Sequence, residues 1–367
     1  MLAWARGAAH RGNSYLMSRR REKSPSFRVL SYAFRGVAMS RATNSDFDLT
    51  ANPPQGVTRA AFLDLAVRSA GAAGLVASSA LSPGLALAAA AAPLVMRPIP
   101  KSKNGEMLPV VGLGTAQEFG ARSDAASMEA KAQVVKQLIE GGGRLLDTAA
   151  SYSNAEEICG EFMERLSLRD KTFVATKFGE RGKDNGISSV ERSFKLLRTK
   201  AIDLMFVHNM IDTDTHLPTL KDYKAKGRIR YYGVTSTGGN QDELTKWMDD
   251  IDFVEFAYSV DLRAPEKRLL PMAQDKGVAV LVALPFGRNR LLNKMRGKEV
   301  PAWAREELNC HSYAQLALKF IAGHPGVTVA IPGTENPKHM AENLDAGRGV
   351  MPDAKQREKI AALWDNA

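Results

Sequence analysis

Apolar and polar positions follow a regular pattern from Met96 to the C-terminus. Short apolar runs, typical of buried strands, alternate with longer segments whose apolar residues recur every three or four positions, as on one face of a helix. The predicted strands are residues 110–113, 144–147, 173–176, 204–207, 231–235, 253–257, 279–284 and 327–331. The predicted helices lie near residues 130–140, 156–166, 189–197, 217–226, 241–248, 267–276, 313–321 and 338–344.

Eight strand–helix units in about 270 residues match the arithmetic of a (β/α)8 barrel. A doubly wound sheet is the main alternative, but it requires a Gly-x-Gly-x-x-Gly turn after its first strand. Here Gly112-Leu113-Gly114-Thr115-Ala116-Gln117 lacks the third glycine. Residues 96–109, with an Asn104-Gly105 turn, predict a hairpin that plugs the barrel floor. The predicted fold class is therefore α/β, a (β/α)8 TIM barrel with an N-terminal hairpin plug and a C-terminal extra helix at residues 353–364.

Residues 1–95 differ from the rest of the chain and are assigned to a leader, which leaves residues 96–367 for the barrel domain. Residues 69–96 carry no charge and are rich in Ala, Gly and Ser. Before them, Thr58-Arg59-Ala60-Ala61-Phe62-Leu63-Asp64 resembles the twin-arginine export motif, with Ala60 in place of the second arginine. A cleaved export signal, a retained membrane anchor and a leader without a function all stay open. A working signal predicts the periplasm or cell envelope, with Met39 as the better start, and a leader without a function predicts the cytoplasm.

The net charge of +10 is concentrated at the front of the chain. The first 41 residues hold nine Lys or Arg and one acid, which leaves 41 basic and 39 acidic residues, a net of +2, for the other 326. A nearly neutral barrel argues against nucleic acid as a partner. Cys159 and Cys310 cannot form a disulfide framework, and the six histidines show no metal-ligand spacing, so no metal is expected.

Four polar side chains follow consecutive predicted strands, where a barrel places its chemistry. Asp147 ends the second strand, Tyr152 lies five residues further in the next loop, Lys177 ends the third strand and His208 ends the fourth. Each residue alone has an ordinary structural explanation, such as a helix cap for the aspartate. Their occurrence together on three consecutive strands indicates a catalytic site.

The motifs around these residues resemble the aldo-keto reductase family. Leu146-Asp147-Thr148-Ala149-Ala150-Ser151-Tyr152 is similar to its D-T-A-x-x-Y signature, and Thr176-Lys177-Phe178 to its lysine strand. Ile331-Pro332-Gly333-Thr334 through Glu342-Asn343-Leu344 resembles its cofactor-phosphate loop. The resemblance runs from about Met96 to Asn343. It implies NAD(P)H-dependent reduction of an aldehyde or ketone to an alcohol, without metal.

The four residues suit that reaction, because hydride delivered to a carbonyl carbon leaves charge on the oxygen. Tyr152 is assigned as the proton donor, with Lys177 as the charge that lowers the phenol pKa from about 10. Asp147 is assigned to pair with Lys177 and fix its position. His208 is assigned to donate a hydrogen bond to the carbonyl oxygen and orient the substrate.

The resemblance also implies a cofactor site, with departures. The family's Gln on strand six is replaced by Glu255, and its stacking aromatic after strand seven is matched only by Phe286. The candidate cofactor-binding residues are Ser236, Glu255, Pro285, Phe286, Gly333, Thr334, Lys338, His339, Glu342 and Asn343.

Cofactor choice depends on cations beside the adenosine ribose, because the extra phosphate of NADP carries close to two negative charges. The family's two usual cation positions hold Gly333 and His339, and Glu335 adds a negative charge nearby. Lys338 is adjacent to the loop. The sequence therefore predicts NADP(H) as cofactor, with NAD(H) open as a second one, and a weakened preference for NADPH.

The segment 285–311 is long for a connection between a strand and a helix, and it is either an ordinary excursion or a flap over the site. Two further functions stay open beside carbonyl reduction. One is a non-catalytic barrel that senses a bound cofactor, and the other is a membrane-tethered or exported redox partner. The expected partner is a small-molecule carbonyl substrate. A monomer is expected, with membrane contact at most transient and through the leader.

Overall fold

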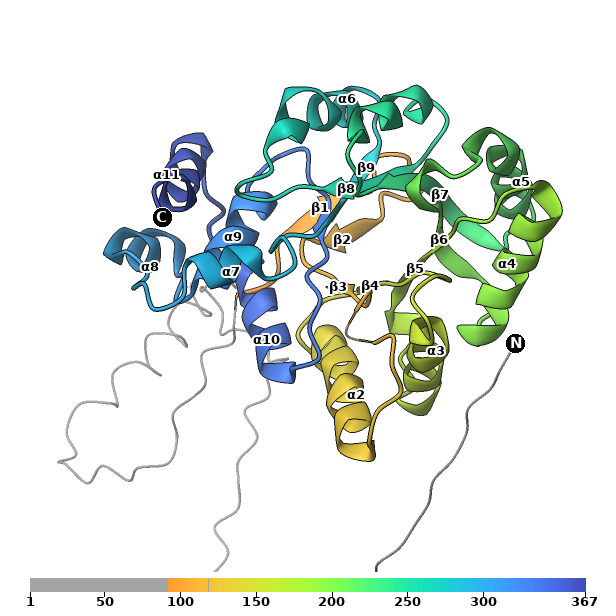
Figure 1. Ribbon diagram of the computed structural model, residues 1–367, viewed down its shortest axis with the longest axis horizontal. Coiled ribbons are helices and arrows are strands. Elements are labelled where there is room, and N and C mark those ends of the chain that lie inside the picture. The colour runs from red at the N-terminus through yellow and green to blue at the C-terminus, as the bar shows by residue number, and fades with distance from the viewer. Residues whose placement is uncertain (1–91, 118) are drawn as a thin grey trace, which may run out of the picture. The chain divides into compact units, whose positions relative to one another are not determined.

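Eight parallel strands form a single sheet at the centre of the molecule (Figure 1), in a computed structural model that describes residues 92–117 and 119–367. The strands are β3 (Leu113–Gly114), β4 (Leu145–Asp147), β5 (Phe173–Phe178), β6 (Ile202–Val207), β7 (Ile229–Ser236), β8 (Phe253–Ala257), β9 (Ala279–Ala283) and β10 (Val329–Ala330). Consecutive strands from β3 to β10 are neighbours in the sheet. This order is the one that consecutive right-handed crossovers produce.

The two ends of the sheet meet and close it into a barrel. Val111 and Gly114 form parallel bridges with Ala330 and Gly333. The backbone N–H of Gly114 donates to the carbonyl of Pro332 at 3.0 Å, and that of Ala330 donates to Val110 at 2.9 Å. The predicted (β/α)8 barrel is therefore confirmed. Strands β3 and β10 are shorter than predicted. Val111 and Gly333, beside these strands, form only the isolated bridges that close the barrel.

Helices surround the strands (Figure 1). They are α2 (Ala125–Glu140), α3 (Ala155–Arg165), α4 (Lys183–Leu196), α5 (Thr213–Ala225), α6 (Leu269–Asp275), α7 (Arg290–Lys294), α8 (Ala302–Leu308), α9 (Tyr313–Ala322), α10 (Pro337–Ala346) and α11 (Ala354–Asp365). The α-helix predicted near residues 241–248 is wrong in type, because this segment is the 3₁₀ helix Gln241–Trp247. There the Thr245 hydroxyl donates to the Asp242 carbonyl at 2.7 Å, a local bond that competes with α-helical pairing.

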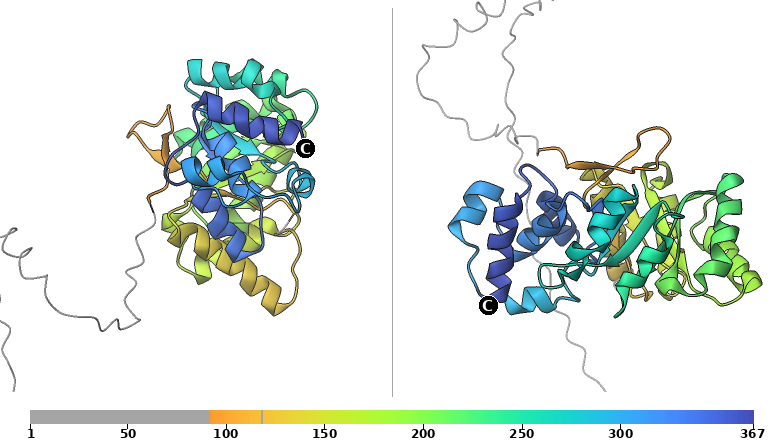
Figure 2. Two further views of the ribbon diagram at one scale, coloured as in Figure 1. Left: turned by 90° about the vertical axis from the view of Figure 1, so that its left-hand side faces the viewer. Right: turned by 90° about the horizontal axis from the view of Figure 1, so that it is seen from above.

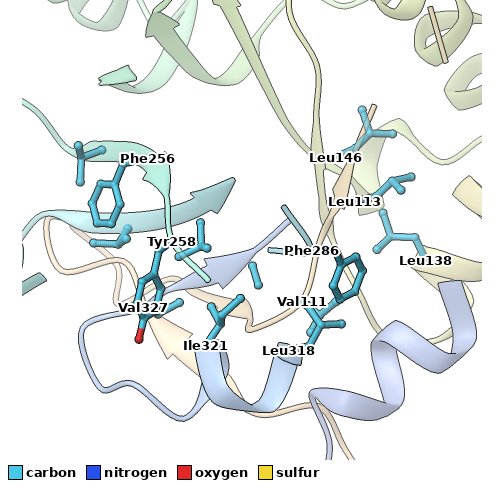
Figure 3. Packing of buried hydrophobic residues seen from close by; sticks show 14 of the residues in the cluster. Val111, Leu113, Leu138, Leu146, Phe256, Tyr258, Phe286, Leu318, Ile321 and Val327 are labelled. Atoms are coloured by element: carbon cyan, nitrogen blue, oxygen red, sulfur yellow. The ribbon is translucent and has the colours of Figure 1, made fainter. Parts of the chain in front are cut away.

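Alternation along each strand divides the apolar residues into two cores. Phe173 and Ala175 of β5 belong to the cluster inside the barrel, whereas Val174 and Phe178 belong to the cluster between strands and helices. Figure 3 shows part of this outer cluster, where Leu113 and Leu146 from strands meet Leu138 of α2. The same alternation places Lys177 on the inner side of β5.

The predicted hairpin plug is present at one end of the barrel (Figure 2). Strands β1 (Met96–Pro98) and β2 (Met107–Pro109) pair antiparallel, and Gly105 in the turn has a φ of +67°. Ile99 and Leu108 belong to the inner core. The Glu106 carboxylate accepts a hydrogen bond from the Tyr231 hydroxyl at 3.0 Å, which ties the hairpin to β7.

The predicted C-terminal helix is confirmed as α11, which begins with a capping box between Asp353 and Gln356. Trp364 near its end is buried, and its indole N–H donates to the Leu291 carbonyl at 3.2 Å. Lys294 donates to the Trp364 carbonyl at 2.6 Å. These contacts join α11 to α7 and so anchor the long connection after β9.

Most of the leader, with its export motif, lies outside the described residues, so its assignment and the localisation stay predictions. Within the described part, contacts with the barrel begin before Met96. Leu94 is buried and bridges to Arg348, and the Val95 N–H donates to the Gly347 carbonyl at 2.8 Å. Among the described residues, no helix is both long and apolar enough to cross a membrane.

We expect Leu94→Ala in the full chain to lower the free energy of unfolding by about 2–3 kcal/mol, because it removes a buried leucine from the outer core. Removing residues 1–95 should cost more stability than removing residues 1–91, by at least as much as the substitution, because only the longer deletion removes Leu94 and the Val95 hydrogen bond. Urea unfolding followed by circular dichroism measures all three. Val350→Ala is the control, because Val350 is 64% exposed. Equal stability of the two truncated proteins would contradict the role of Leu94.

Candidate active site

A buried ion pair lies inside the barrel toward the C-terminal ends of β4 and β5. Lys177 donates hydrogen bonds to Asp147 Oδ2 and, at 3.1 Å, to the carbonyl of Thr148. Both charged side chains are buried, and Lys177 has no exposed surface. Side chains along a strand point alternately into the barrel and out of it. Because Leu146 and Phe178 point outward, Asp147 and Lys177 point inward and meet inside the barrel.

Tyr152 and His208 lie beside this pair. Lys177 Nζ is 5.4 Å from the centroid of the Tyr152 ring. The rings of Tyr152 and His208 meet edge to face, with centroids 5.9 Å apart and planes at 83°. Ser151 Oγ lies 3.3 Å from His208 Nδ1. The four candidate catalytic residues are therefore close neighbours, although they come from β4, the loop after it, β5 and the 3₁₀ turn that follows β6.

These residues border a cavity of about 380 Å³ at the mouth of the barrel. Asp147, Tyr152 and His208 line it directly, while Lys177 is covered by them. The other lining residues are Gly114, Thr115, Ala116, Gln117, Asn209, Thr237, Glu255, Ala283, Leu284, Pro285, Phe286, Arg288, Asn289, Ile331 and Gly333. Such a concave site with a few convergent polar groups suits a small-molecule ligand.

The acidity expected of Tyr152 is not what this structure gives. Burial raises the pKa of the Tyr152 phenol to about 12, and the nearby Lys177 charge lowers it only in part. Lys177 therefore lowers the Tyr152 pKa as expected, but the pKa nevertheless lies above its ordinary value of 10. Desolvation of the phenolate outweighs the single nearby ammonium, whose charge the surrounding carboxylates already balance.

His208 has the opposite shift. Burial, followed by the positive charge of Lys177, lowers the pKa of His208 to about 4. Both causes disfavour the charged imidazolium. His208 is therefore neutral over the whole range from pH 5 upward, and it can donate one hydrogen bond from a ring nitrogen.

Glu255 was assigned to cofactor binding, but it also lies next to Lys177, which the sequence did not predict. Its Oε2 atom lies 3.3 Å from Lys177 Nζ, and the side chain is buried. Burial and the charge of Asp147 raise the pKa of Glu255 to about 8, against the lowering effect of Lys177. Glu255 therefore belongs to the same charged cluster as Asp147 and Lys177.

The other candidate cofactor residues fall into two groups. Pro285, Phe286 and Gly333 line the cavity together with Glu255. Ser236 is buried at the end of β7 but does not line it. Strand parity explains this, because Tyr232 and Val234 belong to the outer cluster, and the next residue of inner parity at the mouth is Thr237.

The remaining candidates gather at the start of α10. Thr334 Oγ1 accepts a hydrogen bond from the N–H of Asn336 at 3.1 Å, and Asn336 in turn caps the helix. Lys338 and His339 are exposed in its first turn, Glu342 is half-buried and Asn343 is buried. None of these residues borders the cavity, although Gly333 at the head of the same loop does.

Eleven lining residues were not among the candidates from the sequence, and six of them are polar, namely Thr115, Gln117, Asn209, Thr237, Arg288 and Asn289. Asn209 directly follows His208, and Gln117 follows the first strand, so position after a strand was a usable signal for both. Arg288 and Asn289 lie in the segment 285–311, with φ of +54° and +67°. Only the beginning of this segment borders the cavity, whereas Trp303 further along packs against the outer core.

A nicotinamide nucleotide fits this donor set. Glu255 lines the cavity, and its buried Oε2 atom has no hydrogen-bond partner, so the side chain can accept from a carboxamide N–H. The N-terminus of α10, a ten-residue helix, offers its partial positive charge and the Lys338 side chain to phosphate, while Asn336 caps the backbone N–H of Lys338. Within residues 92–117 and 119–367, no group of three His, Cys, Asp or Glu side chains is placed to hold a metal ion.

Comparison with known proteins first supports the fold. A crystal structure of an aldo/keto reductase from Klebsiella pneumoniae, in complex with NADP and acetate, superposes with a TM-score of 0.59 at 22% identity. The match covers 71% of this chain and 93% of that one. At this identity the likeness shows the (β/α)8 architecture.

A family model described as the aldo/keto reductase family matches residues 110–365. Because the match covers more than half of the sequence, the chain belongs to the aldo/keto reductase family. Aldo-keto reductase YhdN of Bacillus subtilis is 23% identical over 300 residues, covering 70% of this chain and 90% of its own. Methylglyoxal reductase YeaE of Escherichia coli is 28% identical over 257 residues, covering 64% and 84%.

We expect NMR titration to give His208 a pKa near 4, against an ordinary 6.5. Because unfolded chains bind this proton between about pH 6.5 and 4 and the folded protein does not, stability falls as the pH drops through that window. Lys177→Met should raise the His208 pKa partway, since it removes the second cause. A His208 pKa near 6.5 would contradict the burial argument.

Proposed function

We propose that this member of an NAD(P)H-dependent oxidoreductase family reduces an aldehyde or ketone to an alcohol, with Tyr152 as the proton donor. The observation that carries the proposal is the buried Lys177–Asp147 pair beside Tyr152 at the wall of a cavity. A buried charge pair of this kind is costly to maintain for stability alone. Its position next to a phenol that faces the cavity supports a role in proton transfer.

NADPH would supply the hydride that reduces the carbonyl carbon. The cavity residues Glu255, Pro285, Phe286 and Gly333 would hold the nicotinamide half, and the loop from Thr334 to Asn343 the adenosine phosphate.

Tyr152 would give its proton to the carbonyl oxygen as charge develops there. A phenol with a pKa of about 12 holds its proton until it meets a strong base, and an alkoxide oxygen is such a base. Lys177 then stabilises the phenolate that remains, at about 1.4 kcal/mol for each unit by which it lowers the pKa. Asp147 keeps Lys177 in place through their hydrogen bond.

His208 would orient the substrate. Because it is neutral, it donates a hydrogen bond without adding a charge that competes with Lys177. If the Ser151 hydroxyl donates to Nδ1, the imidazole proton sits on Nε2 and is free for the carbonyl oxygen. Two donors, Tyr152 and His208, would then converge on one oxygen, as an oxyanion site requires.

The substrate class is a small carbonyl compound, in keeping with the size of the cavity. The Escherichia coli relative that is named a methylglyoxal reductase makes a small dicarbonyl the first substrate to test. A barrel that only senses its cofactor would bind NADPH yet turn over no aldehyde or ketone in a panel.

We expect Tyr152→Phe to lower kcat by about 10²–10⁴-fold while the dissociation constant for NADPH changes less than about threefold, because the phenol acts in the transition state. Steady-state kinetics and cofactor fluorescence measure the two effects. Tyr313→Phe is the matched control, since Tyr313 donates to the Glu299 carbonyl at 2.9 Å and does not line the cavity. Turnover within about threefold of the wild type would remove Tyr152 from the mechanism.

We expect both cofactors to bind, with a preference for NADPH below about 100-fold in kcat/KM, or about 2.7 kcal/mol at 1.36 kcal/mol per decade. The first reason is that Gly333 and His339 stand where the family usually has cations for the extra phosphate. The second is the negative charge of Glu335 in the same loop, whose side chain is 62% exposed and whose Oε2 atom lies 4.0 Å from Lys131 Nζ. Kinetics with one aldehyde and each cofactor, together with the two dissociation constants, test this. A preference of several thousandfold would contradict it, and Lys338→Ala would then identify the cation responsible.

A further inference from the structure

Glu255 and Asp147 approach one ammonium group from opposite parts of the barrel. Asp147, on β4, accepts a hydrogen bond from Lys177 Nζ. Glu255, on β8, places Oε2 3.3 Å from the same nitrogen, and this oxygen has no hydrogen-bond partner. Side-chain exposure is 3% for each carboxylate and 0% for the lysine. The arrangement puts two acids and one base in a nearly dry volume.

Charge neutrality requires a proton in this volume. With all three groups ionised, the cluster carries a net negative charge, and a buried unpaired charge is strongly unfavourable. Burial raises the pKa of both carboxyl groups, and the charge and hydrogen bonding of Lys177 lower each of them only in part. Lys177 donates its hydrogen bond to Asp147 Oδ2, whereas Glu255 Oε2 lies 3.3 Å from the same nitrogen, so the ionised form of Asp147 is the better stabilised of the two. The extra proton therefore belongs on Glu255.

Arg288 lines the same cavity, but its charge does not shift the pKa of Glu255, so it does not supply the missing balance. The strand neighbours of Glu255 are Thr235 on β7 and Leu281 on β9, neither of which titrates. The loop after β4 brings Tyr152, and the end of β6 brings His208, which is neutral. Within the described residues, Lys177 is the only cation that shifts the pKa of Glu255.

We propose that Glu255 is an ionisable positioning residue, protonated while the enzyme reduces its substrate, whose ionisation opposes the effect of Lys177 on Tyr152 and slows the reaction. The last step rests on the proposed function, but the protonation does not. The pKa of about 8 agrees with the charge balance. Ionised Glu255 is also one of the charges that raise the Tyr152 pKa, so its proton makes the phenol a better donor.

Protonation also explains how Glu255 can bind the nicotinamide carboxamide at the position where the family has a glutamine. A neutral carboxyl offers one O–H donor and one carbonyl acceptor, as a carboxamide offers an N–H donor and an acceptor. An ionised carboxylate offers acceptors alone. The neutral form is therefore the one that can exchange two complementary hydrogen bonds with an amide.

Infrared spectroscopy of the full-length enzyme without cofactor tests the protonation directly. We expect a carbonyl stretching band of a protonated carboxyl that shifts on ¹³C labelling of glutamate and disappears with an apparent pKa near 8. The band should be absent in Glu255→Gln. Glu156→Gln is the matched control, because Glu156 is equally buried but bonds to Thr176 on the outer side of β5. No titrating glutamate band in the wild-type spectrum would overturn the proposal, even if the Gln variant did not fold.

The pH dependence of kcat/KM tests the effect on the reaction. We expect kcat/KM of the wild type and of Glu156→Gln to fall at least about fivefold between pH 7 and 9.5, because the active form with protonated Glu255 is depleted. Glu255→Gln should lack this decrease, and Glu255→Asp, which keeps a titratable carboxyl, should restore one. A decrease that persists unchanged in Glu255→Gln would overturn the coupling. Failure of the wild type to reduce any carbonyl would instead contradict the proposed function and leave the infrared result intact.

Discussion

The ammonium group of Lys177 inside the barrel is the interaction on which the site depends. A fully buried lysine requires compensating charge or hydrogen bonds, and here two carboxylates from β4 and β8 surround it. This requirement fixes the positions of Asp147 and Glu255, and it places a positive charge next to Tyr152 and His208. The low pKa of His208 follows partly from the same charge. The chemistry of the cavity is thus a consequence of one buried cation.

Barrel closure and the cavity occupy the same place. A Cβ atom on Gly114 would lie 2.8 Å from the carbonyl oxygen of Ile331, so only glycine allows β3 and β10 to approach this closely. Gly114 and Gly333, which bridge the two strands, both line the cavity. The loop that continues from Gly333 leads directly into α10, where the candidate phosphate-binding residues lie. The contact that completes the fold therefore also sets the position of the loop relative to Tyr152.

The connection after β9 combines two functions along its length. Leu284, Gly287, Arg288 and Asn289 all have a positive φ, and this left-handed stretch borders the cavity. Beyond it, α7 is tied to α11 by the hydrogen bonds of Trp364 and Lys294. Non-glycine residues in this conformation carry strain, which the anchored part of the connection can offset. The anchored helix α7 thus keeps the preceding residues, which have a positive φ, beside the cavity.

The sequence by itself determined the order of strands and helices, the barrel, the hairpin plug and the grouping of Asp147, Tyr152, Lys177 and His208. These follow from periodicity and from position after a strand, which are local properties of the chain. Only the tertiary structure decided that Glu255 meets Lys177, that Ser236 is set back from the cavity while Thr237 lines it, and that the Tyr152 pKa is raised. The physical reason is that distances across the barrel interior, and the desolvation that accompanies them, depend on residues from strands far apart in the sequence. Periodicity shows which side of a strand a residue faces, but not which charge it will face there.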